Sequence, residues 1–221
     1  MTNTVPESVD SYIASHLLGD DAILDAVLAA NAAAGLPAID VSPAQGKLLN
    51  LLARIAGARR ILEVGTLGGY SSIWLARALP ADGTLVTLEI DPHHVAVARA
   101  NIAAAGLEPV VDVRQGPAAD SLAKLVADAA EPFDLVFIDA DKPGNVEYVT
   151  RALQLSRPGT VIIVDNVVRG GAVVDADSLD PSVQGTRRLF ELLSAKGSLD
   201  ATAIQTVGLK GHDGFLIGVV R

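Results

Sequence analysis

The pattern of apolar and polar residues changes near residue 59. Before this point, apolar residues recur at helical spacing over residues 8–16, 22–34 and 42–56, which predicts three helices. Ser42 followed by Pro43 is typical of a helix start, because the serine side chain can accept a hydrogen bond from the first turn and proline fits the first helical position. The segment before residue 59 is therefore expected to be helical.

From residue 60 onward, short runs rich in β-branched residues alternate with helical segments. Four such runs occupy residues 60–64, 84–90, 133–138 and 160–164. Their nearly continuous apolar character indicates strands that are covered on both faces. Helical patterns separate these runs at residues 71–79, 92–105, 118–129 and 145–155. This alternation predicts βαβ units around a parallel sheet.

The C-terminal part of the chain adds another helix and a hairpin. The helix is expected over residues 184–196, and two strands are expected over residues 201–207 and 214–220. These two strands are close enough in sequence to pair with each other in an antiparallel hairpin at one edge of the sheet. The predicted sheet is therefore mostly parallel, with an antiparallel C-terminal edge.

A length of 221 residues fits one α/β domain. We predict a single doubly wound domain over residues 1–221, with residues 1–57 as a helical extension and residues 58–221 as a Rossmann-like core. Half of the residues are apolar and 19% are charged, which excludes a disordered or fibrous protein. The absence of cysteine excludes disulfides, thiolate metal sites and cysteine nucleophiles.

The charge balance bears on the partners of the protein. The formal net charge is −9, which disfavours binding to nucleic acid or to anionic membranes. No apolar run approaches the ~20 residues that a membrane helix requires. The first ten residues carry acids and no basic region, so they do not read as a secretory signal. We expect a soluble, cytoplasmic protein.

The loop after the first predicted strand carries the first candidate chemistry, and its sequence is EVGTLGGYSS, from Glu63 to Ser72. Its glycines would let a ligand approach the backbone closely. A dinucleotide fingerprint, G-x-G-x-x-G, would need a second glycine where Leu67 stands. The carboxylate of Glu63 would repel a pyrophosphate but attract a cation such as the amino or sulfonium group of S-adenosylmethionine (SAM).

A second acid, Glu89, stands at the end of the next predicted strand. A carboxylate at this position can accept hydrogen bonds from both ribose hydroxyls of an adenosine. Together with the glycine loop, Glu89 favours an adenosine-containing ligand, with SAM ahead of NAD. An NAD-dependent oxidoreductase remains an alternative, against which the incomplete glycine fingerprint speaks.

Oxygen-bearing side chains follow the next two predicted strands. One strand ends in IDADK, with Asp139, Asp141 and Lys142, and the following strand ends in Asp165 and Asn166. If these strands are neighbours, two carboxylates and an amide oxygen converge, which suits a hard cation such as Mg²⁺. The structural alternatives are that Asp139 caps a helix, that Asp165 and Asn166 open a turn, and that Lys142 pairs with Asp141 rather than acting as a general base.

Three segments, ILEVGTLGGYSS, FDLVFIDADK and VIIVDN, resemble the cation-dependent O-methyltransferases, a family that includes the caffeoyl-CoA and catechol O-methyltransferases. The resemblance runs from about Val41 to the C-terminus. It implies a seven-stranded SAM-dependent methyltransferase fold and a homodimer. It also implies that SAM and a divalent cation are bound, usually Mg²⁺, with Mn²⁺ or Ca²⁺ as other possibilities. The expected acceptor is a catechol-like or hydroxycinnamoyl small molecule that is methylated on one hydroxyl.

The resemblance also assigns roles to individual residues. It implies metal ligation by Asp139, Asp165 and Asn166, and a role as base for Lys142. It implies cofactor contacts for eight residues: Val41, Glu63, Gly65, Ser71, Glu89, Ala118, Asp139 and Asp141. Residues 116–118 are expected beside the adenine. The helices of residues 1–57 are expected to contribute to the acceptor pocket and to the dimer.

Two positions depart from the commoner pattern of this family. Asn145 stands where many members have tyrosine, and Arg169 stands where many have tryptophan. Both positions lie where the acceptor is expected, so caffeoyl-CoA cannot be carried over as the substrate. Arg169 favours an acceptor that bears a carboxylate or phosphate. Two further alternatives are a tRNA hydroxyuridine O-methyltransferase on the same scaffold, which the net charge disfavours, and a SAM-binding module without activity.

Overall fold

The structure is a computed structural model that describes residues 5–221, apart from the side chain of Lys196. It begins with three helices, α1 (Val5–Leu17), α2 (Ala22–Ala33) and α3 (Pro43–Ile55), close to the predicted ranges. Ser42 caps α3, since its Oγ accepts a hydrogen bond from the backbone N–H of Gln45 at 3.2 Å. Helix α1 buries none of its residues. The helical start of the chain is therefore confirmed.

A seven-stranded sheet follows, with the order β3-β2-β1-β4-β5-β7-β6. Its strands are β1 (Arg60–Val64), β2 (Thr84–Glu89), β3 (Val111–Gln115), β4 (Phe133–Ile138), β5 (Ser156–Asp165), β6 (Leu199–Gly208) and β7 (Gly211–Val220). The first five are parallel, whereas β7 runs antiparallel to both β5 and β6. The order reverses between β1 and β4, which is where open α/β sheets bind their ligands. The predicted fold class is confirmed.

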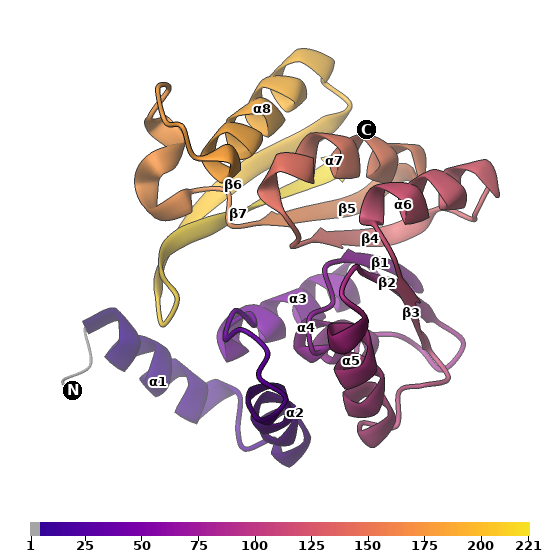
Figure 1. The fold of residues 1–221 in the computed structure, drawn as a ribbon, viewed down its shortest axis with the longest axis vertical. Coiled ribbons are helices and arrows are strands. Elements are labelled where there is room, and N and C mark those ends of the chain that lie inside the picture. The colour runs from indigo at the N-terminus through magenta and orange to yellow at the C-terminus, as the bar shows by residue number, and fades with distance from the viewer. Residues whose placement is uncertain (1–4) are drawn as a thin grey trace.

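Helices cover both faces of the sheet (Figure 1). The later helices are α4 (Tyr70–Ala76), α5 (Pro92–Ala104), α6 (Ala118–Ala127), α7 (Asn145–Gln154) and α8 (Pro181–Lys196), with short 3₁₀ turns η1 (Lys142–Gly144) and η2 (Arg169–Val174). Helices α2 to α5 pack on one face and α6 to α8 on the other. Each face of the sheet has its own hydrophobic core, and β1 contributes to both. Ile61 packs in the core on the side of α2 to α5, and Leu62 in the core on the side of α6 to α8. Both faces of the central strands are thus buried, as their apolar sequences predict.

Two parts of the sheet were not located by the sequence pattern. None of the predicted strand ranges covers β3, because it lies at the edge of the sheet and buries only Val113 among its five residues. Strand β5 begins at Ser156 rather than at residue 160, through a segment whose Arg157, Pro158 and Gly159 do not read as strand. Apolar continuity therefore identifies central strands and misses exposed ones.

The predicted division at residue 57 falls in the turn between α3 and β1, and remains a prediction. Within residues 5–221, none of the helices combines the length and the apolar character that crossing a bilayer requires.

Candidate active site

Two cavities open at the carboxyl ends of the parallel strands. The first has a volume of about 510 Å³ and lies over the loops that follow β1, β2 and β4. The second, of about 560 Å³, lies over the end of β5 and reaches the tip of the β6–β7 hairpin. Asp139 and Asn166 line both cavities. The candidate site is therefore a pair of neighbouring cavities that share these two polar residues.

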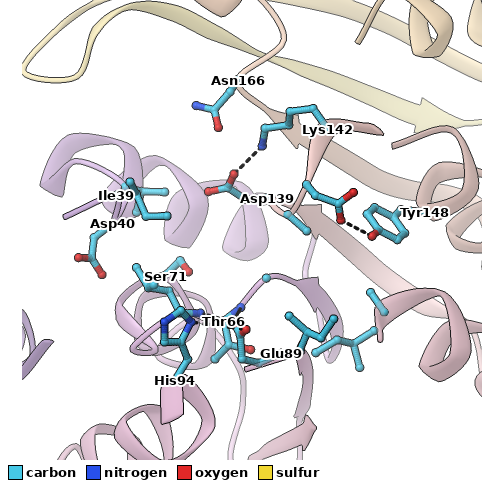
Figure 2. A pocket seen from close by; sticks show the side chains of 18 of the residues that line it. Ile39, Asp40, Thr66, Ser71, Glu89, His94, Asp139, Lys142, Tyr148 and Asn166 are labelled. Atoms are coloured by element: carbon cyan, nitrogen blue, oxygen red, sulfur yellow. Dashed lines mark hydrogen bonds and ion pairs between the residues drawn. The ribbon is translucent and has the colours of Figure 1, made fainter. Parts of the chain in front are cut away.

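The first cavity gathers all but one of the predicted cofactor contacts. Those that line it are Val41, Gly65, Ser71, Glu89, Ala118, Asp139 and Asp141. Figure 2 shows Ser71 and Glu89 on one side of this cavity and Asp139 with Lys142 on another. Gly65 has a φ of 99°, and a Cβ on it would lie 2.1 Å from the carbonyl oxygen of Asp139. Glycine is thus required where the loop after β1 passes the end of β4.

Glu63 is the predicted cofactor contact that does not line either cavity. Its side chain is completely buried beneath the first cavity. It accepts hydrogen bonds from the hydroxyls of Ser71 at 2.6 Å, Thr87 at 2.7 Å and Ser72. Burial raises the pKa of Glu63 to about 7, although these three hydroxyls oppose the shift. In this structure Glu63 therefore reaches the cavity through Ser71, and its own contact with the cofactor remains a prediction.

The buried carboxyl of Glu63 makes stability depend on pH. Its ordinary pKa of 4.5 rises to about 7 in the fold, so the folded protein binds this proton more tightly than the unfolded chain does. Stability is therefore lost as pH rises from 4.5 to 7, and the loss amounts to about 3 kcal/mol from this group. Urea unfolding of wild type and Glu63→Gln at pH 4.5 and 7.5 measures this loss. The free energy of unfolding of the glutamine variant, relative to that of wild type, should be higher at pH 7.5 than at pH 4.5. A relative value that does not change with pH would contradict the raised pKa of Glu63.

Glu89 is already engaged with the backbone of the glycine loop. Its Oε2 accepts hydrogen bonds from the N–H groups of Thr66 at 3.2 Å and Leu67 at 2.8 Å, and its Oε1 accepts one from Asp91 at 3.0 Å. His94, which also lines the first cavity, places its Nδ1 3.6 Å from the same carboxylate. Glu89 thus fixes the shape of the loop while it faces the cavity. His94 was not predicted to line this cavity.

Asp141 is held by the short helix that follows β4. Its Oδ2 accepts a hydrogen bond from the N–H of Gly144 at 3.1 Å, and its Oδ1 accepts one from the hydroxyl of Tyr148 at 2.5 Å. Burial and the hydrogen bond to Asp141 raise the pKa of Tyr148 well above its usual range. Tyr148 also lines the first cavity and was not predicted to do so. Asp141, and not Asp139, is therefore the residue that caps a helix here.

Lys142 pairs with Asp139 rather than with Asp141. Its Nζ lies 2.8 Å from Oδ1 of Asp139, and its side chain is buried (Figure 2). The backbone of Lys142 is held closely by α8, because a Cβ on Gly185 would lie 2.3 Å from the carbonyl oxygen of Lys142. The suggestion of an ion pair between Lys142 and Asp141 is therefore wrong, and the lysine amine is directed to the carboxylate shared by the two cavities.

The ends of β4 and β5 lie side by side, since Ile138 pairs with Val164. The condition for the predicted metal set is thus met, because Asp139 directly follows β4 and Asp165 is the last residue of the adjacent strand β5. Gln45 of α3 donates a hydrogen bond to Asp165 Oδ2 at 2.7 Å. Burial, and after it the charge of Asp139, raises the pKa of Asp165 to about 7.

This donor set fits a divalent cation. Burial and the charge of Asp139 penalise a negative charge on Asp165, and a cation between the two carboxylates would relieve that penalty. In the part of the chain from residue 5 to 221, no three His, Cys, Asp or Glu side chains gather in the manner of a metal site. A metal would therefore need the amide oxygen of Asn166 as its third protein ligand, and the three oxygens would suit Mg²⁺.

Comparison with known proteins identifies the family. The sequence model of a family described as O-methyltransferase matches residues 14–215. The chain belongs to this O-methyltransferase family. It is 55% identical over 223 residues to a catechol O-methyltransferase of Niastella koreensis, covering 100% of both chains. It is 53% identical over 216 residues to a catechol O-methyltransferase of Mycobacterium tuberculosis, covering 98% of this chain and 96% of the relative.

Solved structures agree with this O-methyltransferase assignment. An O-methyltransferase from Bacillus cereus in complex with SAH matches with a TM-score of 0.96 and 56% identity, over 98% of each chain. An O-methyltransferase from Streptomyces achromogenes involved in tomaymycin synthesis, in complex with SAM, matches with a TM-score of 0.95 and 51% identity, over 100% of this chain and 99% of that one. The protein is a SAM-dependent O-methyltransferase, and neither an oxidoreductase nor a tRNA methyltransferase is favoured.

Proposed function

We propose that this O-methyltransferase transfers the methyl group of SAM to one hydroxyl of a catechol-like small molecule, with the help of a divalent cation. The observation that carries the proposal is the shared wall of the two cavities, where Asp139 and Asn166 face both spaces. A methyl donor in one cavity and an acceptor in the other would meet at this wall. The names of the relatives in Niastella koreensis and Mycobacterium tuberculosis support a catechol as the acceptor.

The first cavity is the proposed SAM site. The predicted contacts that line it are Val41, Gly65, Ser71, Glu89, Ala118, Asp139 and Asp141. Carboxylates suit both ends of the ligand, because one can accept hydrogen bonds from ribose hydroxyls and another can attract the amino and sulfonium charges. Glu89 is the proposed partner of the ribose, and Asp139 and Asp141 are proposed for the charged part of SAM.

The second cavity is the proposed acceptor site. Its lining is mixed, with apolar side chains such as Ile39, Leu48 and Phe215 beside charged ones such as Asp10 and Lys210. The carboxylates of Asp139 and Asp165 and the amide of Asn166 form one polar part of it. An apolar ring whose oxygens are grouped on one edge matches this lining, because the ring can pack against the apolar side chains while its oxygens reach the polar part.

Asp139, Asp165 and Asn166 would hold the divalent cation, and Mg²⁺ is the proposed metal. When bound, the cation supplies positive charge that favours the deprotonated form of a nearby phenol. Lys142 is the proposed base, since its buried side chain lines the first cavity and its amine lies 2.8 Å from Asp139, which lines both cavities. Lys142 would accept the phenolic proton at Nζ, which requires its neutral form and therefore a weaker hold by Asp139.

Arg169 is a proposed determinant of acceptor choice. It lines both cavities, and its Nη1 lies 4.0 Å from Oδ2 of Asp213. Its buried Nε has no hydrogen-bond partner among the described residues. The predicted preference for an acceptor with a carboxylate or phosphate is retained as part of the proposal, with Asp213 as the acid that competes for the guanidinium.

The homodimer is likewise a proposal. Helix α1 exposes apolar side chains, among them Val5, Tyr12 and Leu17, and a second copy of the chain would cover them.

Product formation from SAM and a panel of acceptors tests the proposed function. Catechol, caffeate, caffeoyl-CoA and plain phenol, which has no neighbouring hydroxyl, are incubated with enzyme that has been stripped with EDTA, with and without added Mg²⁺. We expect methylated catechol only when Mg²⁺ is restored. Equal turnover without any divalent cation would contradict the proposed role of the metal. Turnover confined to the phenol without a neighbouring hydroxyl would contradict the proposed catechol-like acceptor.

A further inference from the structure

Two buried asparagines connect helices α2 and α5 with the loops that line the cavities. Asn31 of α2 is 2% exposed and Asn101 of α5 is 6% exposed. The Nδ2 of Asn101 donates hydrogen bonds to Oδ1 of Asn31 at 2.9 Å and to the carbonyl oxygen of Gly68 at 2.8 Å. The Nδ2 of Asn31 donates to Oδ1 of Asp40 at 2.9 Å. Asn31 thus stands at the centre of a chain of hydrogen bonds between three segments.

The glycine loop is built around Asn31. A Cβ on Gly68 would lie 1.9 Å from Oδ1 of Asn31, so that a side chain at position 68 would displace the asparagine. The front of the same loop, at Gly65, Thr66 and Leu67, lines the first cavity. Asn31 therefore packs against the loop from behind while the loop faces the cofactor space.

Asp40 belongs to a segment that borders both cavities. Both Asp40 and its neighbour Ile39 line the first and the second cavity. Figure 2 shows the two residues across the first cavity from Tyr148, with the carboxylate of Asp40 turned away from Asp139 and Lys142. This direction takes the carboxylate to Asn31, and not to the groups at which the reaction is proposed to occur.

The carboxylate of Asp40 depends on Asn31. Burial raises its pKa, and the hydrogen bond from Asn31 opposes this shift. Within residues 5–221, Asn31 is the one side chain that donates a hydrogen bond to Asp40. Lys210 contributes charge from the β6–β7 hairpin and anchors the same segment by donating to the carbonyl oxygen of Ala38 at 3.2 Å. Loss of Asn31 would leave a half-buried carboxylate without its side-chain donor.

We propose that Asn31 is a positioning residue for the methyl donor. Through Asp40 it fixes the segment of residues 38–41 at the border of the cavities, and through Asn101 and Gly68 it fixes the glycine loop. Helix α2 thereby contributes to cofactor binding without contacting the cofactor. The proposal requires only the SAM site, so it stands or falls independently of the metal and of the catechol.

Exchanging the side chains of Asn31 and Asp40 tests this proposal. Asn31→Asp sets two carboxylates against each other at the present 2.9 Å contact, whereas the double variant Asn31→Asp/Asp40→Asn restores a donor and an acceptor in swapped positions. Calorimetric Kd values for SAH are measured for wild type, both single variants and the double variant. We expect Asn31→Asp to weaken binding by about tenfold or more, and the double variant to recover at least most of that loss.

Asn50→Ala is the matched control. Asn50 is also a buried asparagine, and its Nδ2 donates to the carbonyl oxygen of Trp74 at 2.9 Å, outside both cavities. We expect this variant to lower the melting temperature but to keep the wild-type Kd for SAH. If Asn31→Asp does not fold, Asn31→Ala is compared with Asn50→Ala in the same way, and should bind SAH at least about fivefold more weakly.

Two results would overturn the proposal. The first is a wild-type Kd for SAH in the folded Asn31 variants. The second is equally weak binding of SAH in Asn31→Asp, in Asp40→Asn and in the double variant. That result would mean that the charge of Asp40 binds the donor directly. Recovery in the double variant, with weak binding in Asn31→Asp, supports the positioning role, since a purely structural defect would not be repaired by the swap.

Discussion

Replacing Lys142 with alanine is expected to lower kcat by about 10²- to 10⁴-fold, the usual contribution of a general base, while SAM still binds. The expectation rests on the position of Lys142, which is buried, lines the first cavity and contacts Asp139, a residue of both cavities, at 2.8 Å. The alanine variant lacks the amine beside Asp139 that would take the phenolic proton. Single-turnover rates and calorimetric binding of SAH separate the two effects.

Lys142→Arg distinguishes a base from a mere positive charge. Arginine keeps the ion pair with Asp139 but does not give up its proton at accessible pH, so it cannot serve as a base. We expect Lys142→Arg to be nearly as slow as Lys142→Ala. Recovery of most of the wild-type kcat in the arginine variant would show that Lys142 acts through its charge, and the assignment as base would then be wrong.

Replacing Asp165 with alanine is expected to weaken the response to Mg²⁺ strongly. Asp165 is the last residue of β5, beside the end of β4 that carries Asp139, and it supplies one of the two charges in the proposed metal set. Removing one of the two charged ligands should raise the Mg²⁺ concentration needed for half-maximal activity by roughly 10²-fold or more. Even loss of an outer-shell partner of a metal ligand typically lowers metal affinity or activity by about 10- to 100-fold. A titration of activity with Mg²⁺ after EDTA treatment measures the change.

The matched control is Asp112→Ala, which removes an exposed carboxylate on β3 that pairs with Arg114. This variant should keep both the wild-type kcat and the wild-type response to Mg²⁺. Near-ultraviolet circular dichroism establishes that the Asp165 variant is folded. If folded Asp165→Ala enzyme responds to Mg²⁺ as wild type does, Asp165 is not a metal ligand.

Much of the site could be predicted because a parallel sheet places the ends of its strands at one edge. Asp139 and Asp165 are 26 residues apart in sequence, yet the adjacent strands β4 and β5 bring them to neighbouring positions. The same reasoning puts Gly65 and Glu89 on the first cavity. Glu63 lies deeper than these two residues, because it is within β1 on the face of Ile61 and beneath Ser71, and its contact with the cofactor remains a prediction.

The residues that were missed come from segments that only the folded chain brings to the site. Gln45 reaches Asp165 across 120 residues of sequence, and Asn31 reaches Asn101 across 70. No local spacing records these contacts, since each asparagine or glutamine reads as an ordinary polar position on a helix. Tyr148 does carry a signal, because it lies seven residues after Asp141, on the first turns of the helix that follows.

The most direct test of the central claim is a crystal structure of this O-methyltransferase grown with Mn²⁺ and SAH, with data collected to locate manganese by its anomalous scattering. We predict SAH in the first cavity and one manganese ion bound by oxygens of Asp139, Asp165 and Asn166, at the wall that both cavities share. An anomalous signal elsewhere, or SAH bound with none at these three side chains, would contradict the proposed metal-assisted methyl transfer.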